Sequence, residues 1–237
     1  MSEWAPRRFY TEATVTETEG GYGIALDGRR VMTPGKSPLV VPTRALAEAI
    51  AAEWAAQGEK IAPETMPFTR TANSAIEKVA PQRAAVADML AEYGDSDLLC
   101  YRAVDPEPLV ALQSERWDPM LAWAAEHLGA ALEPRAGLMH APQPPEALER
   151  LAVRTHTLDH FRLAAFHDLV ALTGSLVLGF AATDPAQDPE VLWALSRLDE
   201  TWQEETWGID EEAREMSENK RRAFLHAHRF FAHCATD

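Results

Sequence analysis

The sequence predicts an α+β protein, in which a small N-terminal antiparallel β-rich domain with one helix precedes a larger all-α helical domain. Three observations predict this class. β-branched and aromatic residues with glycine turns dominate the first forty residues, and apolar residues recur with helical spacing afterwards. Between the two patterns, residues 59–67 carry two prolines and show no periodicity. We therefore place the domain boundary between residues 1–65 and residues 66–237.

The N-terminal strands are separated by turn residues. Gly20 and Gly21 end the first strand, which is rich in threonine. The pair Asp27-Gly28 supplies the positive φ angles that a type I′ hairpin turn requires. A Pro-Gly pair then turns the chain again before one more short strand. The strands are predicted over residues 9–17, 22–26, 29–33 and 39–41.

One helix belongs to the N-terminal domain, and seven more follow. Thr43 can cap the first helix, which runs through Gln57 with Leu46, Ile50 and Trp54 on one face. Proline at first-turn positions marks most of the later starts, and glycine marks several ends. The later helices are predicted over residues 69–79, 81–93, 108–128, 145–158, 161–182, 189–206 and 210–234.

The chain is strongly acidic, because 37 Asp and Glu residues oppose 22 Lys and Arg residues and give a net charge of −15. Such a surface repels phosphate backbones and anionic lipids, so we expect neither nucleic acid nor a membrane surface as a partner. The longest uncharged run, residues 169–183, is too short for a membrane-spanning helix of about 20 residues. No membrane insertion is therefore expected.

Cysteine content and the N-terminus bear on location. Cys100 and Cys234 lie far apart without a metal-ligand spacing, which fits buried thiols in a reducing compartment. Residues 1–6 resemble neither a secretory signal nor a transit peptide. From these residues a cytoplasmic protein is expected.

The sequence contains no strong catalytic motif. Gly35-Lys36-Ser37 matches the end of a phosphate-binding loop, but Arg30 stands where the pattern needs glycine and Pro38 blocks the required helix. A turn between strands is the better interpretation. The paired carboxylates lie in charge-rich helices without a sign of burial, which is typical of solvated faces. We therefore expect no enzyme, no catalytic residue, no cofactor and no metal.

Three histidines leave an alternative function open. His156, His160 and His167 fall on one helical face if the helix continues through residue 158, and such a face could hold zinc. No glutamate directly follows His156, as a metalloprotease helix would require. A metal-dependent hydrolase is thus the enzymatic alternative, and zinc analysis would discriminate it.

Aromatic residues embedded in acid are the most unusual feature. Residues 184–218 hold 12 acidic residues against two arginines. In the helix predicted there, Leu195, Leu198 and Trp202 form a stripe that would pack on the core. Charged residues that surround an exposed tryptophan are typical of an interface anchor with a polar rim. The second face of this helix presents Trp193, Arg197, Glu200, Glu204 and Trp207.

These tryptophans have two interpretations. They are exposed anchors for a partner, or one or both are buried against the C-terminal helix, since tryptophan is mostly buried wherever it occurs. The positions of the tryptophans on a helical wheel do not decide between the two interpretations.

Short motifs in a fixed order resemble one protein family over nearly the whole chain. They are Arg8-Phe9-Tyr10, Leu26-Asp27-Gly28-Arg29 with Thr33-Pro34, Ala51-Ala52-Glu53-Trp54, Met66-Pro67, Asp97-Leu98-Leu99-Cys100-Tyr101-Arg102, Trp117-Asp118-Pro119, His167-Asp168 with Thr173-Gly174-Ser175, and Trp202-Gln203 with Glu205 and Trp207-Gly208. The family that they resemble is the assembly chaperone for the α subunit of the F-one catalytic head of ATP synthase.

The resemblance implies an ATP-independent chaperone that binds the unassembled α subunit and covers the surface that later meets the β subunit. It also implies a β-rich N-terminal domain and a helical C-terminal domain. Because the family occurs in mitochondria and in α-proteobacteria, the resemblance implies the mitochondrial matrix if the source is eukaryotic and the cytoplasm if it is bacterial, which Met1 favours. A general holdase for unfolded chains is a further alternative, and it would protect unrelated proteins as well. A monomer is expected, because the partner is supplied by another chain.

The partner-binding residues are predicted in the helical domain. Glu205 and Trp207 lie in the part that best matches the family, whereas Glu200 and Glu204 depend mainly on the helical wheel. The carboxylates would supply charge complementarity and the exposed tryptophans would act as anchors. The full prediction comprises Trp193, Glu200, Gln203, Glu204, Glu205 and Trp207, with Trp54 as a weaker candidate that could instead tie the first helix to the sheet.

Overall fold

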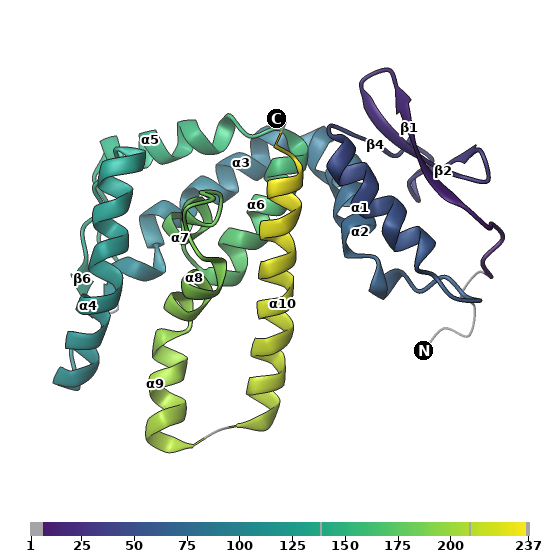
Figure 1. Cartoon of the computed structure of the whole chain (residues 1–237). Coiled ribbons are helices and arrows are strands. Elements are labelled where there is room, and N and C mark those ends of the chain that lie inside the picture. The colour runs from purple at the N-terminus through teal and green to yellow at the C-terminus, as the bar shows by residue number, and fades with distance from the viewer. Residues whose placement is uncertain (1–6, 138, 209, 236–237) are drawn as a thin grey trace. The chain divides into compact units, whose positions relative to one another are not determined.

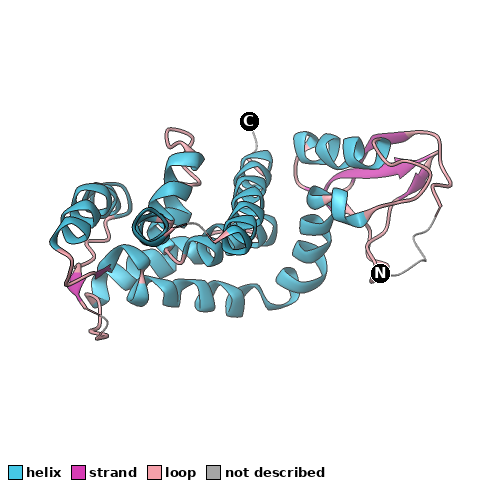
Figure 2. Cartoon of the chain, turned by 90° about the horizontal axis from the view of Figure 1, so that it is seen from below, coloured by secondary structure: helices cyan, strands magenta, loops and turns pink. Residues whose placement is uncertain are grey.

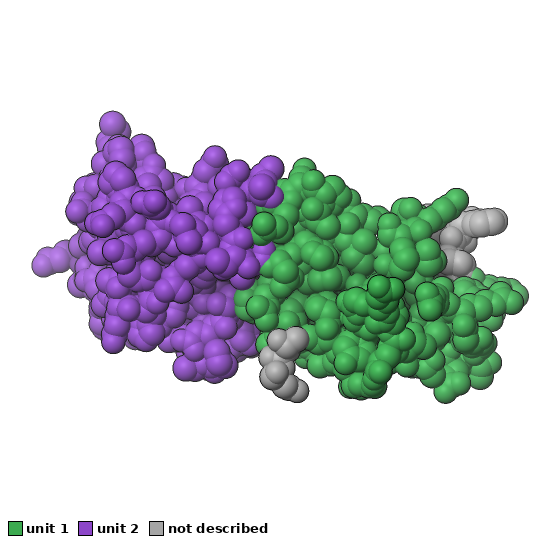
Figure 3. Space-filling view, turned by 90° about the horizontal axis from the view of Figure 1, so that it is seen from above, with its two compact units in different colours: residues 1–83, 159–165, 229–237 green, residues 84–158, 166–228 purple. Residues whose placement is uncertain are grey.

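The computed structural model describes residues 7–137, 139–208 and 210–235 (Figure 1). The prediction from residues 1–6, that no targeting leader is present, lies outside these residues. The described chain divides into two compact units, drawn in two colours in Figure 3. Unit 1 comprises residues 1–83, 159–165 and 229–237, and unit 2 comprises residues 84–158 and 166–228. That residues 1–65 and 66–237 are separate folding domains stays a prediction.

Unit 1 contains a small antiparallel sheet, as the sequence predicts (Figure 2). The central strand β2 pairs with β1 on one side and with β3 and β4 on the other. Asp27 and Gly28 adopt φ angles of 47° and 79°, which confirms the hairpin turn. The strands are β1 (Ala13–Thr18), β2 (Gly21–Leu26), β3 (Arg29–Arg30) and β4 (Val40–Val41).

Helix α1 (Arg44–Ala55) packs against the sheet of unit 1. Its N-cap is Thr43, whose side chain accepts a hydrogen bond from the backbone N–H of Leu46 at 3.2 Å, as predicted. Its Glu53 carboxylate accepts the N–H groups of Phe68 and Thr69 at 2.6 and 2.8 Å. These two groups begin helix α2 (Pro67–Ser74), so a side chain of α1 caps α2.

The rest of the chain is mostly helical, which confirms the predicted class. One addition is a two-stranded parallel sheet that no residue pattern predicts, formed by β5 (Tyr101–Arg102) and β6 (Arg135–Ala136). The helices are α3 (Arg83–Ala91), α4 (Glu107–Trp123), α5 (Pro145–His156), α6 (His160–Thr173), α7 (Leu176–Ala181), α8 (Pro189–Ser196), α9 (Leu198–Trp207) and α10 (Glu211–His233). Short 3-10 segments span Pro63–Thr65, Ala80–Gln82, Glu92–Ser96 and Leu98–Cys100, and π-helical segments span Ala75–Val79 and Ala124–Leu128.

The helix predicted over residues 161–182 is two helices. Gly174 has a φ of 71°, a left-handed conformation that ends α6. Ser175 then caps α7 by accepting the N–H of Leu178 at 3.0 Å. Gly174 and Ser175 therefore form the turn between α6 and α7, and the prediction of one helix over residues 161–182 is wrong.

The helix predicted over residues 189–206 is also two helices. The break is at Arg197, which has φ −111° and ψ 14°. Just before it, the carbonyl of Leu195 accepts the indole N–H of Trp117 at 2.9 Å, and the carbonyl of Trp193 accepts the hydroxyl of Ser196 at 2.7 Å. Side chains thus occupy carbonyls that a continuous helix would need, and α9 begins as a separate helix.

Both cysteines are buried, as the sequence predicts. Cys100 and Cys234 are buried free thiols, and burial raises the pKa of each to about 12. Among residues 7–137, 139–208 and 210–235, no helix combines the length and apolar character needed to cross a membrane.

The Asp97 carboxylate is the most buried acidic group described in unit 2. Its side chain has no exposed surface, and its oxygens accept the N–H groups of Leu99 and Val177, each at 3.0 Å. The contact ties the turn before β5 to the first turn of α7. Burial raises the pKa of Asp97 to about 6, against the lowering effect of its hydrogen bonds.

Replacing Asp97 by asparagine will destabilise unit 2. An amide NH2 would face backbone N–H groups that now find an acceptor, and each unpaired buried donor costs about 1–3 kcal/mol. We expect Asp97→Asn to lower the free energy of unfolding by at least that amount in urea titration. Glu146→Gln, at an exposed site, is the control and should change it by less than about 0.5 kcal/mol. Equal stabilities of the two variants would refute this role of Asp97.

Candidate functional site: the acidic face of α9

Helices α9 and α10 form an antiparallel hairpin joined at residues 208–210 (Figure 1). Residues 199–218 hold nine acidic residues and only one basic residue, Arg214. Apart from Ser217, which is half-buried, the first ten residues of α10 are exposed. The hairpin therefore presents a concentrated negative charge to solvent.

The positions of these acids along the helices are informative. Asp199, Glu200, Glu211 and Glu212 lie in first turns, where the helix dipole favours negative charge. Glu204 and Glu205 instead lie near the C-terminal end of α9, whose last turn has no basic residue. The dipole disfavours carboxylates there, so stabilisation of α9 does not explain them.

The predicted residues of α9 lie mostly on its surface. Trp207 is 78% exposed at the end of the helix. Glu200, Gln203 and Glu205 are exposed, and Glu204 is half-buried. Among the described residues, the side chains of Gln203, Glu204 and Glu205 form no hydrogen bond or ion pair. Glu200 forms an ion pair with Arg197 at 2.9 Å. We call Glu200, Gln203, Glu204, Glu205 and Trp207 the α9 face; at about 100° per residue, Glu205 lies on another side of the helix from the other four.

Trp193 does not belong to this face, because it is only 6% exposed. Its ring lies 5.7 Å from that of Phe224 on α10, and the guanidinium of Arg197 covers it at 5.1 Å. The wheel placed Trp193 beside Trp207 by assuming one continuous helix, and the break at Arg197 removes that relation. Of the two interpretations, burial against the C-terminal helix is correct for Trp193 and exposure is correct for Trp207.

The predicted core stripe of this segment is partly buried. Leu198 is buried, whereas Leu195 and Trp202 are half-buried. Leu198 is also the one buried residue of α9. Apolar packing therefore anchors α9 mainly at its first residue.

Trp54 lies in unit 1 and is half-buried. Its carbonyl accepts the hydroxyl of Tyr10 at 2.7 Å, and the two rings lie 5.8 Å apart, edge to face. Its indole N–H is buried without a hydrogen-bond partner among the described residues. These contacts tie α1 to the segment that leads into β1, and binding of a partner by Trp54 stays a prediction.

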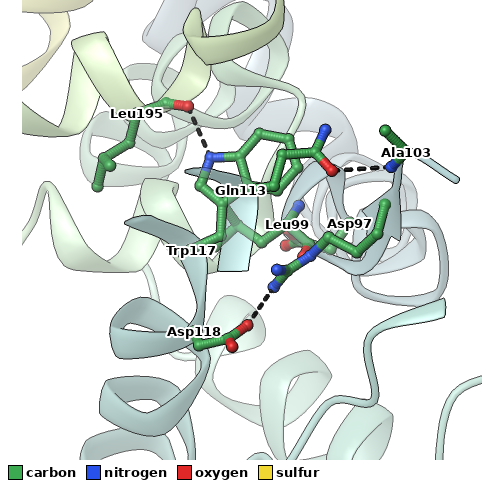
Figure 4. A network of polar contacts seen from close by, with 8 residues as sticks. Asp97, Leu99, Ala103, Gln113, Trp117, Asp118 and Leu195 are labelled. Atoms are coloured by element: carbon green, nitrogen blue, oxygen red, sulfur yellow. Dashed lines mark hydrogen bonds and ion pairs between the residues drawn. The ribbon is translucent and has the colours of Figure 1, made fainter. Parts of the chain in front are cut away.

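A buried polar network on α4 supports the start of α9 (Figure 4). Trp117 is fully buried and donates to the Leu195 carbonyl, and Gln113 reaches both Ala103 and Asp199. Arg102, also buried, forms an ion pair with Asp118 at 2.7 Å. No sequence pattern distinguishes Gln113, because a single glutamine in a helix gives no signal by itself.

The three histidines of the hydrolase alternative have other contacts. His156 lies 2.8 Å from an Asp88 oxygen, and His167 lies 2.9 Å from an Asp168 oxygen. The ring of His160 lies 4.3 Å from that of Phe161. In the part of the chain that the structure describes, no three His, Cys, Asp or Glu side chains are grouped to hold a metal ion.

The Gly35-Lys36-Ser37 segment is a turn, as interpreted from the sequence. Lys36 has a φ of 68°, and its N–H donates to the Thr33 carbonyl at 2.9 Å. The N–H of Gly35, which a phosphate would need, donates to the Glu77 carboxylate. The Glu77 carboxylate thus occupies a donor that a bound phosphate would use.

Comparison with known proteins identifies the family. The family described as ATP12 chaperone protein matches residues 7–125, half of the chain. The chain belongs to the ATP12 chaperone family. The relative "Protein atp12, mitochondrial" of Schizosaccharomyces pombe is 25% identical over 243 residues, which cover 98% of this chain and 84% of that protein.

Solved structures of ATP12 proteins agree with this assignment. The crystal structure of Atp12 from Paracoccus denitrificans is 49% identical, covers 97% of this chain and 98% of its own, and superposes with a TM-score of 0.95. A mutant of P. denitrificans Atp12p has the same coverage and TM-score at 48% identity. The fold described above is therefore that of the ATP12 family.

The two tryptophans of this segment will differ in their effect on stability. Truncating a buried tryptophan leaves a cavity, so Trp193→Ala should lower the free energy of unfolding by about 3–5 kcal/mol. Trp207→Ala removes an exposed side chain and should change it by less than about 0.5 kcal/mol. Urea denaturation followed by circular dichroism measures both, and similar losses would contradict the assigned exposures.

The pKa values of His167 and His160 will be shifted in opposite directions from the ordinary value of histidine. The hydrogen bond to Asp168 raises the pKa of His167, whereas burial lowers the pKa of His160. NMR titration of the imidazole resonances should therefore show His167 losing its proton at a higher pH than His160. Asp168→Asn should lower the pKa of His167 and leave that of His160 unchanged. An unchanged His167 in that variant would disprove the assigned cause.

Proposed function

We propose that this protein is an ATP-independent assembly chaperone that binds the unassembled α subunit of the F-one head of ATP synthase. Membership of the ATP12 chaperone family supports the role in assembly. The exposed α9 face supports a docking surface, and it is the observation that carries the proposal. We place its action where the F-one head assembles, in the bacterial cytoplasm or in the mitochondrial matrix.

The physical need for such a protein follows from subunit assembly. A folded α subunit without its β neighbours exposes a large apolar surface, which promotes self-association and aggregation. A chaperone that covers this surface must later give way to the β subunit. An interface with few aromatic anchors and many charges at its rim suits that exchange, because rim charges contribute more to association rate than to affinity.

The α9 face has the composition of such an interface. Trp207 offers a large ring that is exposed to solvent, and tryptophan is enriched among the residues that dominate binding energy. The carboxylates around it have no described cationic partner except Arg197, so their negative potential extends into solvent. We infer that the client presents a basic patch next to an apolar pocket for the ring.

The proposal assigns no catalytic step, cofactor or metal to the chain. Trp54 is a second, weaker candidate for client contact, and its tie to Tyr10 means that its replacement would first affect folding of unit 1. A general holdase remains the competing function, and it predicts protection of unrelated aggregating proteins.

Removing the α9 face will weaken binding of the α subunit. We expect Glu204→Ala/Glu205→Ala/Trp207→Ala to bind recombinant α subunit at least about tenfold more weakly and to keep less of it soluble, because an anchor and two charges are lost. Co-purification and calorimetry measure the effect, after circular dichroism has established that the variant is folded.

The matched control lies on α5 in the same unit. Glu146→Ala/Glu149→Ala/Val153→Ala also removes two exposed charges and one exposed apolar side chain. It should bind like the wild type. Wild-type affinity in the α9 variant would refute the proposed surface, and equal protection of unrelated proteins by the wild type would favour the general holdase.

A further inference from the structure

The direction of α9 is not determined by continuation of α8. The two helices meet at Arg197, whose backbone leaves helical geometry. Beyond this point apolar packing comes from the half-buried ring of Trp202, since Leu198 is the one buried side chain of α9. Polar contacts near the start of α9 therefore also contribute to the orientation of the α9 face.

Gln113 on α4 makes such a contact from the protein interior. Its side chain is 1% exposed, and its Nε2 donates to Asp199 Oδ1 at 2.7 Å. Its Oε1 accepts the backbone N–H of Ala103 at 2.8 Å (Figure 4). The N–H of Ala103 needs an acceptor and the carboxylate of Asp199 needs a donor, so the two contacts together determine which way the amide faces.

We propose that Gln113 is a positioning residue that sets the direction of α9 and so presents the α9 face to the client. Asp199 lies in the first turn of α9, and Trp207 lies eight residues further on, about 12 Å along the axis at 1.5 Å per residue. A tilt of roughly 10° at Asp199 would move the Trp207 end by about 2 Å. That displacement exceeds the roughly 1 Å by which the interface backbone of a pre-organised complex usually moves on binding.

With a carboxylate at position 199, the side chain at position 113 must be a neutral amide. A primary amide offers one acceptor and one donor at the same time, whereas an ionised carboxylate offers acceptors alone and an aliphatic side chain offers neither. Two neighbouring contacts hold the end of α8 and Arg197. Trp117 donates to the Leu195 carbonyl, and Arg197 Nη2 lies 3.4 Å from the Leu172 carbonyl. Gln113 is thus the link from the interior to α9 itself.

Three variants of the full chain test this role. In Gln113→Glu, two carboxylates face each other at positions 113 and 199 with no donor between them. In Asp199→Asn, the new amide can still present its oxygen to the Gln113 donor. In Gln113→Glu/Asp199→Asn, the donor and acceptor exchange places, the hydrogen bond is restored, and the net charge equals that of the wild type.

Hydrogen exchange of α9 and affinity for recombinant α subunit are the two readouts. We expect Gln113→Glu to speed exchange of α9 amides at least tenfold and to weaken binding at least tenfold. Asp199→Asn and the double variant should stay within about threefold of wild type in both. Restoration by the double variant is the decisive signature, because general damage to the α4 core would not be repaired at position 199.

The inference rests on the proposed function only in its binding arm. Unchanged α9 exchange in Gln113→Glu, or failure of the double variant to restore it, overturns the positioning role whatever the client is. Faster α9 exchange with wild-type affinity also overturns it, provided that the α9 triple variant loses binding. If the triple variant binds like the wild type, the proposed function fails instead, and the exchange data still decide whether Gln113 orients α9.

Discussion

The indole of Trp117 takes the Leu195 carbonyl out of helical hydrogen bonding, and the arrangement of the acidic hairpin depends on this contact. Because the helix stops at Arg197, Trp193 and Trp207 belong to different helices and need not share a face. Trp193 can then pack on Phe224, where it contributes to the core, while Trp207 stays in solvent. One buried hydrogen bond thus separates a structural tryptophan from one that is free to contact a partner.

The acidic hairpin is a region where stability and function have different requirements. Carboxylates in the first turns of α9 and α10 agree with the helix dipoles, whereas Glu204 and Glu205 oppose the dipole of α9. A weakly packed helix that carries unfavourable charges needs support from elsewhere. The interior of unit 2 supplies it through Gln113 and Trp117, two α4 side chains that do not reach the surface.

Polar side chains that are buried or half-buried join separate segments at several places. Asp97 joins the turn before β5 to α7, Glu53 joins α1 to α2, and Arg102 joins β5 to α4. Each such group would cost free energy if its partner were lost, so each favours one arrangement of the segments over others. The ATP12 fold seen here therefore combines ordinary apolar packing with specific polar ties.

Local patterns predicted the elements of this protein, and long-range contacts decided how they are divided. The Asp27-Gly28 hairpin, the Thr43 cap and most helix starts follow from the conformational preferences of residues near in sequence. The break at Gly174 is local too, since a glycine in the left-handed conformation is followed by the cap Ser175. The break at Arg197, the β5–β6 pair and the burial of Trp193 do not follow from near neighbours, since partners dozens of residues away compete for the same backbone groups or rings. The sequence alone determined the class, the acidic charge and the candidate residues of α9. Only the tertiary structure decided which of those residues face solvent, because exposure depends on what each helix packs against.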